Sequence, residues 1–493
     1  MQLVHTPPSA GDRIAAYVAA VATTSLLLLA AATASTSGSP TSTALLVAGA
    51  SFAWAALLVT SSALSAREAL WLALGCALVA GVACALAPPV LSDDIYRYLW
   101  DGRVTLSGTS PYRYAPDDPH LAGLRDALWR RVNNPEIPTI YPPAAQALFA
   151  LGDAIRHDPL PIKVLMLVAH LGTVPIVARL APAASRSRAT LAFGLCPLAL
   201  SEAALSGHVD AVAGLAIAAA VLALVRSRAF GAALFFGLAS ATKLVGLVLA
   251  PLVALRDRRA AVLAMLLSLA PLLALAGAGG SETTGGLGNY ARRWRGNEGA
   301  FLLLEGGAGL VVDGVAWSTD SSATHVRVPA LRGLIEALRG TPFDPRAGLN
   351  GPKKSAPDST DFQRVYVAGL LARILALGVV FGLAAWLVRR RAEPLAAARL
   401  VLLVALLLAP QLHPWYLLWL LPLECAFGGL AGLVWAMNVL VAYAPADRWL
   451  ADRVWTEPWG AHLAVHGLVW LVLAAEAYAA FGARPRKIPV DAS

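Results

Sequence analysis

Long apolar segments separated by short polar connections run along most of the chain. A helix needs about 20 apolar residues to cross about 30 Å of hydrocarbon, and many of these segments reach that length. The pattern predicts an all-α polytopic membrane protein, a single integral membrane domain over residues 1–493 with about 12–14 transmembrane helices. The expected spans are residues 13–34, 44–64, 68–90, 160–180, 189–205, 208–226, 228–241, 243–255, 258–278, 363–389, 394–411, 414–428, 430–445 and 461–481. The short pair 228–241 and 243–255 can also be read as one broken element.

Composition supports a membrane protein and argues against a large soluble helical protein. The 493 residues are 58% hydrophobic and only 14% charged, well below the roughly 25% charged residues of soluble domains. The mean hydropathy is +0.63. All four cysteines lie inside apolar runs, which predicts neither a disulfide framework nor a metal site. They are Cys76, Cys84, Cys196 and Cys425.

The positions of lysine and arginine predict the orientation in the membrane. Short cytoplasmic connections are enriched in these residues. If the N-terminus is cytoplasmic, six basic connections fall on the cytoplasmic side: Arg67, 179–188, 225–228, 256–259, 388–391 and 483–487. The net charge of +9 is therefore attributed to topology and anionic lipid, with no nucleic acid partner. Two long segments, 91–159 and 279–362, become extracytoplasmic loops of a multi-pass protein of the inner (plasma) membrane.

An unusual concentration of charge follows the third span, in LSDDIYRYLWDGRV (91–104). If Ser92 caps a helix, Asp93 and Asp94 simply occupy its first turn, where carboxylates favour the helix dipole. At helical spacing, however, four polar and aromatic side chains share one face. These are Asp94, Arg97, Tyr98 and Asp101. Aromatic rings stack on sugars, charged groups bind their hydroxyls, and an ionised aspartate can deprotonate an attacking hydroxyl.

Other polar residues are predicted at the outer ends of spans, and each has a structural alternative. His208 and Asp210 lie near Glu202 at one outer turn, where His208 can cap a helix. Lys243 can extend toward the headgroups, and the aromatic residues beside His413 can form an interfacial belt. Arg292, Arg293 and Arg295 can contact lipid phosphates. Ionisable residues near membrane depth are nonetheless costly and usually functional, so their one-sided placement favours a single outward-facing site.

These residue types fit sugar transfer from a lipid phosphate. Cations at the hydrocarbon edge suit a phosphate whose lipid tail stays in the bilayer, and a carboxylate above them suits a hydroxyl nucleophile. Direct displacement would invert the anomeric centre. The sequence shows neither a metal-ligand cluster nor a cytoplasmic Gly-rich nucleotide loop, so no metal or cofactor is expected and a nucleotide-sugar donor is disfavoured.

The chain resembles the GT-C superfamily of polyprenyl-phosphate-sugar-dependent glycosyltransferases, particularly bacterial mannosyltransferase-like members. The resemblance is spread over residues 92 to 422, and the order and spacing of its motifs are more specific than any one of them. The motifs are SDDIYRYLWDGRV, GTSPYRYAP, NNPEIPTIYPPAAQ, GHVDAVAGL, ATKLVGLVLAPL, RRWRGNEGAF and HPWYLLWLLPL.

The resemblance implies a GT-C-type helical bundle whose catalytic aspartate lies in the first large external loop. That position matches Asp94 or Asp93, and Asp94 is preferred because it shares a face with Arg97 and Asp101. Mannose is the expected sugar, passed from a polyprenyl-phosphate donor to a lipid or glycan acceptor. Two other classes remain open: a transporter or flippase of lipid-linked saccharides, which should carry its polar residues near the bilayer midplane, and a non-catalytic envelope scaffold.

Overall fold

The computed structural model describes residues 9–277, 286, 296–315, 359–452 and 460–482. The described residues are about 80% helical and form no strand, which confirms the predicted all-α polytopic membrane protein. Within these residues, seven helices are long and apolar enough to cross a membrane. They are α1 (Ala10–Thr36), α2 (Pro40–Thr60), α3 (Ala66–Leu86), α6 (Pro159–Leu180), α12 (Arg258–Gly277), α16 (Ser359–Arg389) and α21 (Ala461–Gly482).

One further pair of helices is long and apolar enough only when its two bent parts are taken together. α7 (Arg186–Gly194) meets α8 (Pro197–Leu200) and the π-helical turn Ser201–Leu205 at an angle of 44°. Pro197 explains the bend, because the residue before a proline is driven out of the helical conformation. Cys196 accordingly has an extended backbone.

The remaining predicted spans are also helical but short. They are α9 (Asp210–Val225), α10 (Ala229–Lys243), α11 (Gly246–Leu249) with Ala250–Leu255, α17 (Pro394–Leu407), α18 (Leu417–Phe427) and α19 (Ala431–Asn438) with Val439–Tyr443. The pair 228–241 and 243–255 forms two elements, since Leu244 leaves the helix with a positive φ of 55°. α14 (Phe301–Val315) packs on α16.

Small residues bring the membrane helices close together. The buried face of α3 includes four fully buried alanines: Ala69, Ala73, Ala77 and Ala80. A Cβ added to Gly194 of α7 would lie only 2.8 Å from the Cβ of Ala73. Membrane helices have little hydrophobic drive to associate, so such close contacts supply much of the packing energy.

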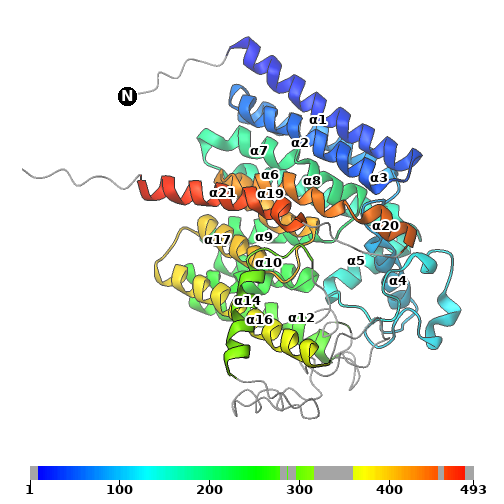
Figure 1. Ribbon diagram of the computed structural model, residues 1–493. Helices are drawn as coiled ribbons and strands as arrows, with labels where there is room; N and C mark the ends of the chain where they lie inside the picture. The colour runs from blue at the N-terminus through cyan, green and yellow to red at the C-terminus, as the bar shows by residue number, and fades with distance from the viewer. Residues whose placement is uncertain (1–8, 278–285, 287–295, 316–358, 453–459, 483–493) are drawn as a thin grey trace, which may run out of the picture.

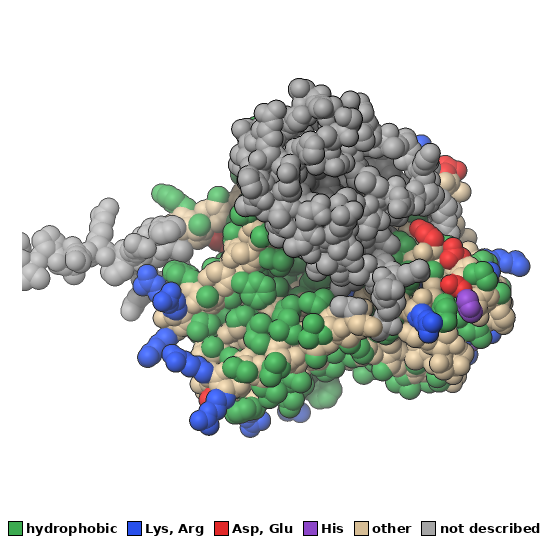
Figure 2. Space-filling view, turned by 90° about the horizontal axis from the view of Figure 1, so that it is seen from below, with side chains coloured by type: hydrophobic (Ala, Val, Ile, Leu, Met, Phe, Trp, Pro, Cys, Tyr) green, Lys and Arg blue, Asp and Glu red, His purple; other side chains and the backbone are tan. Residues whose placement is uncertain are grey.

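The two ends of the bundle differ in structure and charge. α4 (Asp94–Leu106) and α5 (Pro143–Ile155) lie together at one end, on the right of Figure 1, while α1 begins and α21 ends at the opposite end. Figure 2 shows apolar side chains over the middle of one face, with most of the visible Lys and Arg at the left end, and Asp, Glu and His together with a few Lys and Arg toward the right. This distribution agrees with the predicted separation of basic connections from the polar loop end.

Candidate active site

A cavity of about 680 Å³ lies at the end of the bundle that carries α4 and α5. Its wall comes from segments far apart in the sequence: the start of α4, residues 133–142, the end of α10, residues 411–419 and residues 442–449. Five of the predicted site residues line this cavity together. They are Asp93, Asp94, Arg97, Lys243 and His413. The helical bundle therefore brings together polar residues that are up to about 320 positions apart.

Asp93 and Asp94 share one hydrogen-bond donor. The side-chain nitrogen of Asn133 donates to Asp93 Oδ1 at 2.9 Å and to Asp94 Oδ1 at 2.7 Å. Asp93, the N-cap residue of α4, makes no side-chain capping hydrogen bond, and Ser92 Oγ accepts the backbone N–H of Asp94 at 3.3 Å. The Asp93 carboxylate is therefore turned toward other side chains instead of the helix terminus.

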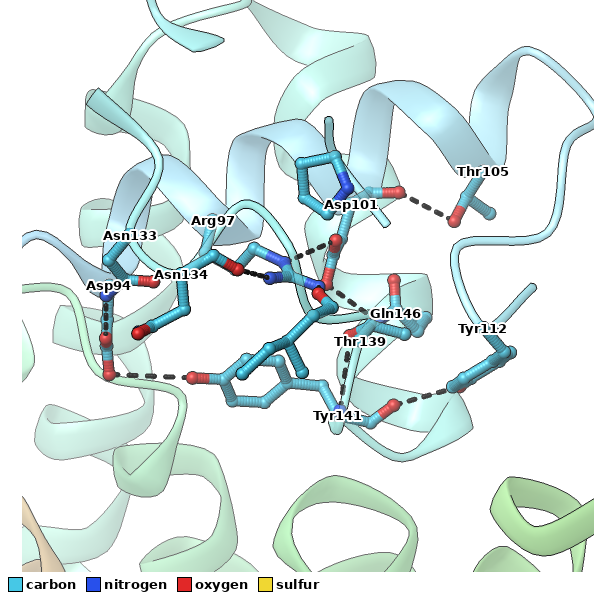
Figure 3. Close-up of polar contacts among 12 residues, drawn as sticks. Asp94, Arg97, Asp101, Thr105, Tyr112, Asn133, Asn134, Thr139, Tyr141 and Gln146 are labelled. Atoms are coloured by element: carbon cyan, nitrogen blue, oxygen red, sulfur yellow. Dashed lines mark hydrogen bonds and ion pairs between the residues drawn. The ribbon is translucent and has the colours of Figure 1, made fainter. Parts of the chain in front are cut away.

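The second oxygens of the two carboxylates have different surroundings. Asp93 Oδ2 accepts a hydrogen bond from the Trp449 indole at 3.2 Å. Asp94 Oδ2 has only a long contact of 3.5 Å with the Tyr141 hydroxyl, seen in Figure 3, and lies 4.0 Å from His208 Nε2. Burial and the nearby Asp94 charge raise the pKa of Tyr141 well above its usual value, so this hydroxyl stays protonated and donates. Asp94 Oδ2 is thus the more weakly held oxygen.

Arg97 braces the wall that carries Asn133. Its guanidinium pairs with Asp101 at 2.9 Å, as Figure 3 shows, and donates to the backbone oxygen of Ile137 at 2.8 Å. Gln146 of α5 donates to the other Asp101 oxygen at 3.3 Å. Arg97 lines the cavity, whereas Asp101 is buried behind it and is held by Arg97 and Gln146.

Tyr98 also lies behind the cavity wall. Its ring is fully buried, stacked on Phe149 at 4.3 Å and edge-on to Tyr141 at 5.0 Å. The helical face predicted for α4 is confirmed by the Arg97–Asp101 pair, but only Asp94 and Arg97 of that face reach the cavity. Tyr98 and Asp101 support residues that do so.

Lys243 ends α10 beside a strained turn. The next residue, Leu244, has a left-handed backbone although it is not glycine, and such conformations cluster at functional sites. The Lys243 ammonium lies 3.3 Å from Asp210 Oδ2 and 4.9 Å from the centre of the Tyr141 ring. Asp210 is fully buried, so the ion pair and the aromatic face together hold the ammonium at the cavity wall.

A stack of three rings forms another part of the wall. Trp415 lies between His208, at 3.9 Å, and His413, at 4.2 Å. Burial lowers the pKa of His413 to about 3, so its ring is neutral at physiological pH. His208 is fully buried beneath Trp415 and is hydrogen-bonded to Glu202.

The positive charges of the described wall are compensated by carboxylates behind it. Its two cations, Arg97 and Lys243, are each paired with a buried aspartate. Among the described residues, no three His, Cys, Asp or Glu side chains are grouped as metal ligands. The predicted site residues Arg292, Arg293 and Arg295 lie outside the described residues.

Several wall residues were not singled out from the sequence. Asn133 and Tyr141 belong to the motif NNPEIPTIYPPAAQ, whose adjacent polar and aromatic residues were a usable signal. Tyr443 lies within the predicted span 430–445 and Trp449 follows it, and no local pattern distinguishes either residue. Their position in the wall depends on how the C-terminal helices pack.

The described residues thus form a helical membrane bundle with an acidic and aromatic cavity at one end. The family described as MptA_B family, alpha-(1->6)-mannopyranosyltransferase, N-terminal domain, matches residues 11–259, just over half of the chain. The chain belongs to this mannosyltransferase family and is a glycosyltransferase. No curated protein and no solved structure matches it. The matched residues include Asp93, Asp94 and Lys243.

Proposed function

We propose that the protein transfers mannose from a polyprenyl-phosphate donor to a lipid or glycan acceptor on the extracytoplasmic face, with inversion at the anomeric carbon. The family description supports an α-(1→6) linkage in the product. The observation that carries the proposal is that Asp94 and Lys243 line one cavity at one end of the membrane bundle. A base and a cation for the leaving phosphate are thereby available to the same substrate pair.

Asp94 is the proposed general base. Its Oδ2 faces the cavity with only a long hydrogen bond, whereas both oxygens of Asp93 have close donors. The acceptor hydroxyl oxygen attacks the anomeric carbon, its proton passes to Asp94 Oδ2, and the bond to the phosphate oxygen breaks with its electron pair leaving on the phosphate. A positioned proton acceptor contributes about 10²–10⁴-fold to such a step.

Lys243 is proposed to bind the donor phosphate. Its ammonium is held beside Tyr141 and Tyr416, whose rings also offer faces on which a sugar can stack. Asp210 offsets part of the Lys243 charge and fixes its position. Arg292, Arg293 and Arg295 remain candidates for further phosphate contacts, and His413 for a contact with a sugar hydroxyl.

The extracytoplasmic side is proposed from the charge distribution. Most of the visible Lys and Arg gather at the end of the bundle opposite α4 and α5 (Figures 1 and 2), and basic residues favour the cytoplasmic side. The cavity would then open away from the cytosol, where lipid-phosphate sugars are the available donors. The cavity's position at one end, away from the middle of the bundle, also disfavours the transporter alternative.

A donor comparison tests the proposal. Purified protein is incubated with radiolabelled polyprenyl-phosphate mannose, polyprenyl-phosphate glucose or arabinose, or a nucleotide-linked mannose, together with mannolipid and mannan-oligosaccharide acceptors. We expect transfer from polyprenyl-phosphate mannose and an α-linked product from a β-linked donor. Transfer from the nucleotide sugar alone, or movement of lipid-linked sugar across vesicles without transfer, would reject it.

Lys243→Gln is expected to weaken donor use selectively. Glutamine can still donate a hydrogen bond to Asp210 but carries no charge, and one preorganised charge contact is worth about 3 kcal/mol, or about 100-fold. The KM for the lipid donor should therefore rise by about 10–100-fold, while the KM for the acceptor stays within about twofold. Equal changes in both values would contradict a phosphate role. Arg179→Gln, which removes an exposed cation bonded only to its own helix, is the matched control.

Asn133→Ala is expected to reduce turnover more than substrate binding. The substitution removes the shared donor of the two carboxylates, so Asp94 loses the contact that fixes its orientation. Loss of precise orientation can cost about 100-fold when reacting groups shift by about 1 Å. Steady-state kinetics should show a lower kcat with a nearly unchanged KM. Thr105→Ala is the control, because the Thr105 hydroxyl donates to the backbone oxygen of Asp101 within α4 and is not among the residues of the described cavity wall.

A further inference from the structure

We propose that His208 is a proton-relay residue that takes up, through Asp94, the proton removed from the acceptor hydroxyl. This inference deepens the proposed function and rests on it. It assigns to His208 a role other than the substrate contact expected from the sequence, because the ring is fully buried and Trp415 stacks over it at 3.9 Å. His208 can reach the reaction only through a neighbouring side chain.

The geometry places His208 between Asp94 and a buried carboxylate. His208 Nε2 lies 4.0 Å from Asp94 Oδ2 and 3.2 Å from Ser92 Oγ. On the opposite side of the ring, Nδ1 is hydrogen-bonded to Glu202 Oε2 at 2.9 Å. Glu202 is also fully buried, and its other oxygen accepts a hydrogen bond from the Tyr443 hydroxyl. The series Asp94–His208–Glu202–Tyr443 therefore connects two residues of the cavity wall, Asp94 and Tyr443, through two fully buried side chains.

The backbone around this pair is specially shaped. Glu202 lies in the π-helical turn Ser201–Leu205, and π-helical turns occur frequently at functional sites. Gly207 has a φ of 77°, and a Cβ there would lie 2.6 Å from Ile95 Cδ1. The backbone N–H of His208 donates to the backbone oxygen of Glu202 at 2.9 Å. This turn places the two side chains of a sequence-local pair face to face, whereas an ordinary helix would not.

The relay balances as two proton transfers. Asp94 Oδ2 first takes the proton of the acceptor hydroxyl as its oxygen bonds to the anomeric carbon. The protonated Asp94 then gives this proton to the lone pair of His208 Nε2, while Nδ1–H stays donated to Glu202. The resulting imidazolium is offset by the Glu202 carboxylate, as a buried charge must be. Afterwards it returns the proton by the same route to water or to the released phosphate in the cavity.

The separation of 4.0 Å is longer than a hydrogen bond, and catalytic contacts are often this loose before substrate binds. Ser92 contacts both residues, since its hydroxyl accepts the Asp94 backbone N–H and lies within hydrogen-bond distance of His208 Nε2. Stacking on Trp415 and the bond to Glu202 leave the ring little freedom to turn away. A small shift of Asp94 would complete the contact.

The test combines kinetics with chemical rescue. Wild type, His208→Gln and His208→Ala are assayed with polyprenyl-phosphate mannose, with and without added imidazole. We expect kcat to fall by about 100-fold in both variants, with each KM within about twofold of wild type. Added imidazole should raise the kcat of His208→Ala by at least about tenfold. His170→Ala is the matched control, because His170 is equally buried but donates only to the Gly194 backbone oxygen.

The pH profile of kcat supplies a second readout. The titratable groups that face His208 are Asp94, Glu202, Asp210 and His413, with Tyr443 behind Glu202. We expect His208→Gln to remove or shift one limb of the profile, and a merely structural role would leave its shape unchanged. An increase in KM alone, a normal kcat, or a reduced kcat with neither rescue nor a changed profile overturns the relay. If Asp94→Asn is inactive in the same assay, that result leaves the transferase proposal intact, whereas inactivity of wild type with every lipid-phosphate donor rejects the proposed function itself.

Discussion

Replacing Asp94 with asparagine is expected to abolish mannosyl transfer, with kcat reduced by about 1,000-fold or more. The change is nearly isosteric, so the new amide oxygen can still accept the hydrogen bond that Asn133 donates at 2.7 Å. What is lost is the ability to accept a proton from the acceptor hydroxyl, a contribution of about 10²–10⁴-fold. Turnover of radiolabelled polyprenyl-phosphate mannose measures the effect, and binding of the donor should remain within about twofold of wild type.

Asp93→Asn is the matched control for this experiment. Asp93 shares the Asn133 donor but also accepts from Trp449, so its carboxylate is held in the wall. We expect a loss of kcat at least about tenfold smaller than that of Asp94→Asn, with the same thermal stability in both variants. The reverse order of activities would assign the base to Asp93, and near-normal turnover of Asp94→Asn would remove Asp94 from that role.

The largest loss of stability is expected from Arg399→Leu. Arg399 of α17 is buried and joins three helices, because its guanidinium pairs with Glu424 of α18 and with Glu476 of α21 at 3.0 Å. Glu424 is fully buried and also accepts the Gly432 N–H at 2.9 Å. Removing one partner of a buried ion pair leaves an uncompensated charge and costs about 3–5 kcal/mol. Calorimetric unfolding in detergent should show this loss.

Arg13→Leu provides the comparison for Arg399→Leu. Arg13 also pairs with a glutamate, Glu68, but its side chain is 49% exposed. Exposed ion pairs are screened by water and contribute little, so the unfolding temperature should barely change. Equal shifts for the two variants would show that the Arg399 network does not hold α17, α18 and α21 together.

The membrane fold was largely predictable because its main determinant is local. Each predicted span is helical in the structure, since a backbone in hydrocarbon must satisfy its hydrogen bonds within the segment. The break after α10 was less predictable. Leu244 adopts a left-handed conformation that leucine does not favour, and only the surrounding packing explains it.

The site was predictable as a set of residue types and much less as a set of contacts. The one-face spacing of Asp94, Arg97 and Asp101 follows from helical geometry. The same spacing does not reveal that Asp101 is buried behind the wall or that Arg97 braces residues 133–139. Contacts such as Asp93 with Trp449 join residues 356 positions apart, and no local pattern encodes them.

Hydrophobicity and the positions of basic residues by themselves determined an all-α membrane protein with its unusual polar residues expected at one end, because the cost of placing polar groups in lipid acts on every segment separately. Packing decided which of those residues meet in the cavity and which lie behind it. It also decided that Asn133 contacts Asp93 and Asp94, and that Glu202 and Tyr443 lie behind His208. The physical reason is that hydrogen bonds and ion pairs depend on distances of about 3 Å between side chains from different helices, and those distances exist only once the helices are assembled.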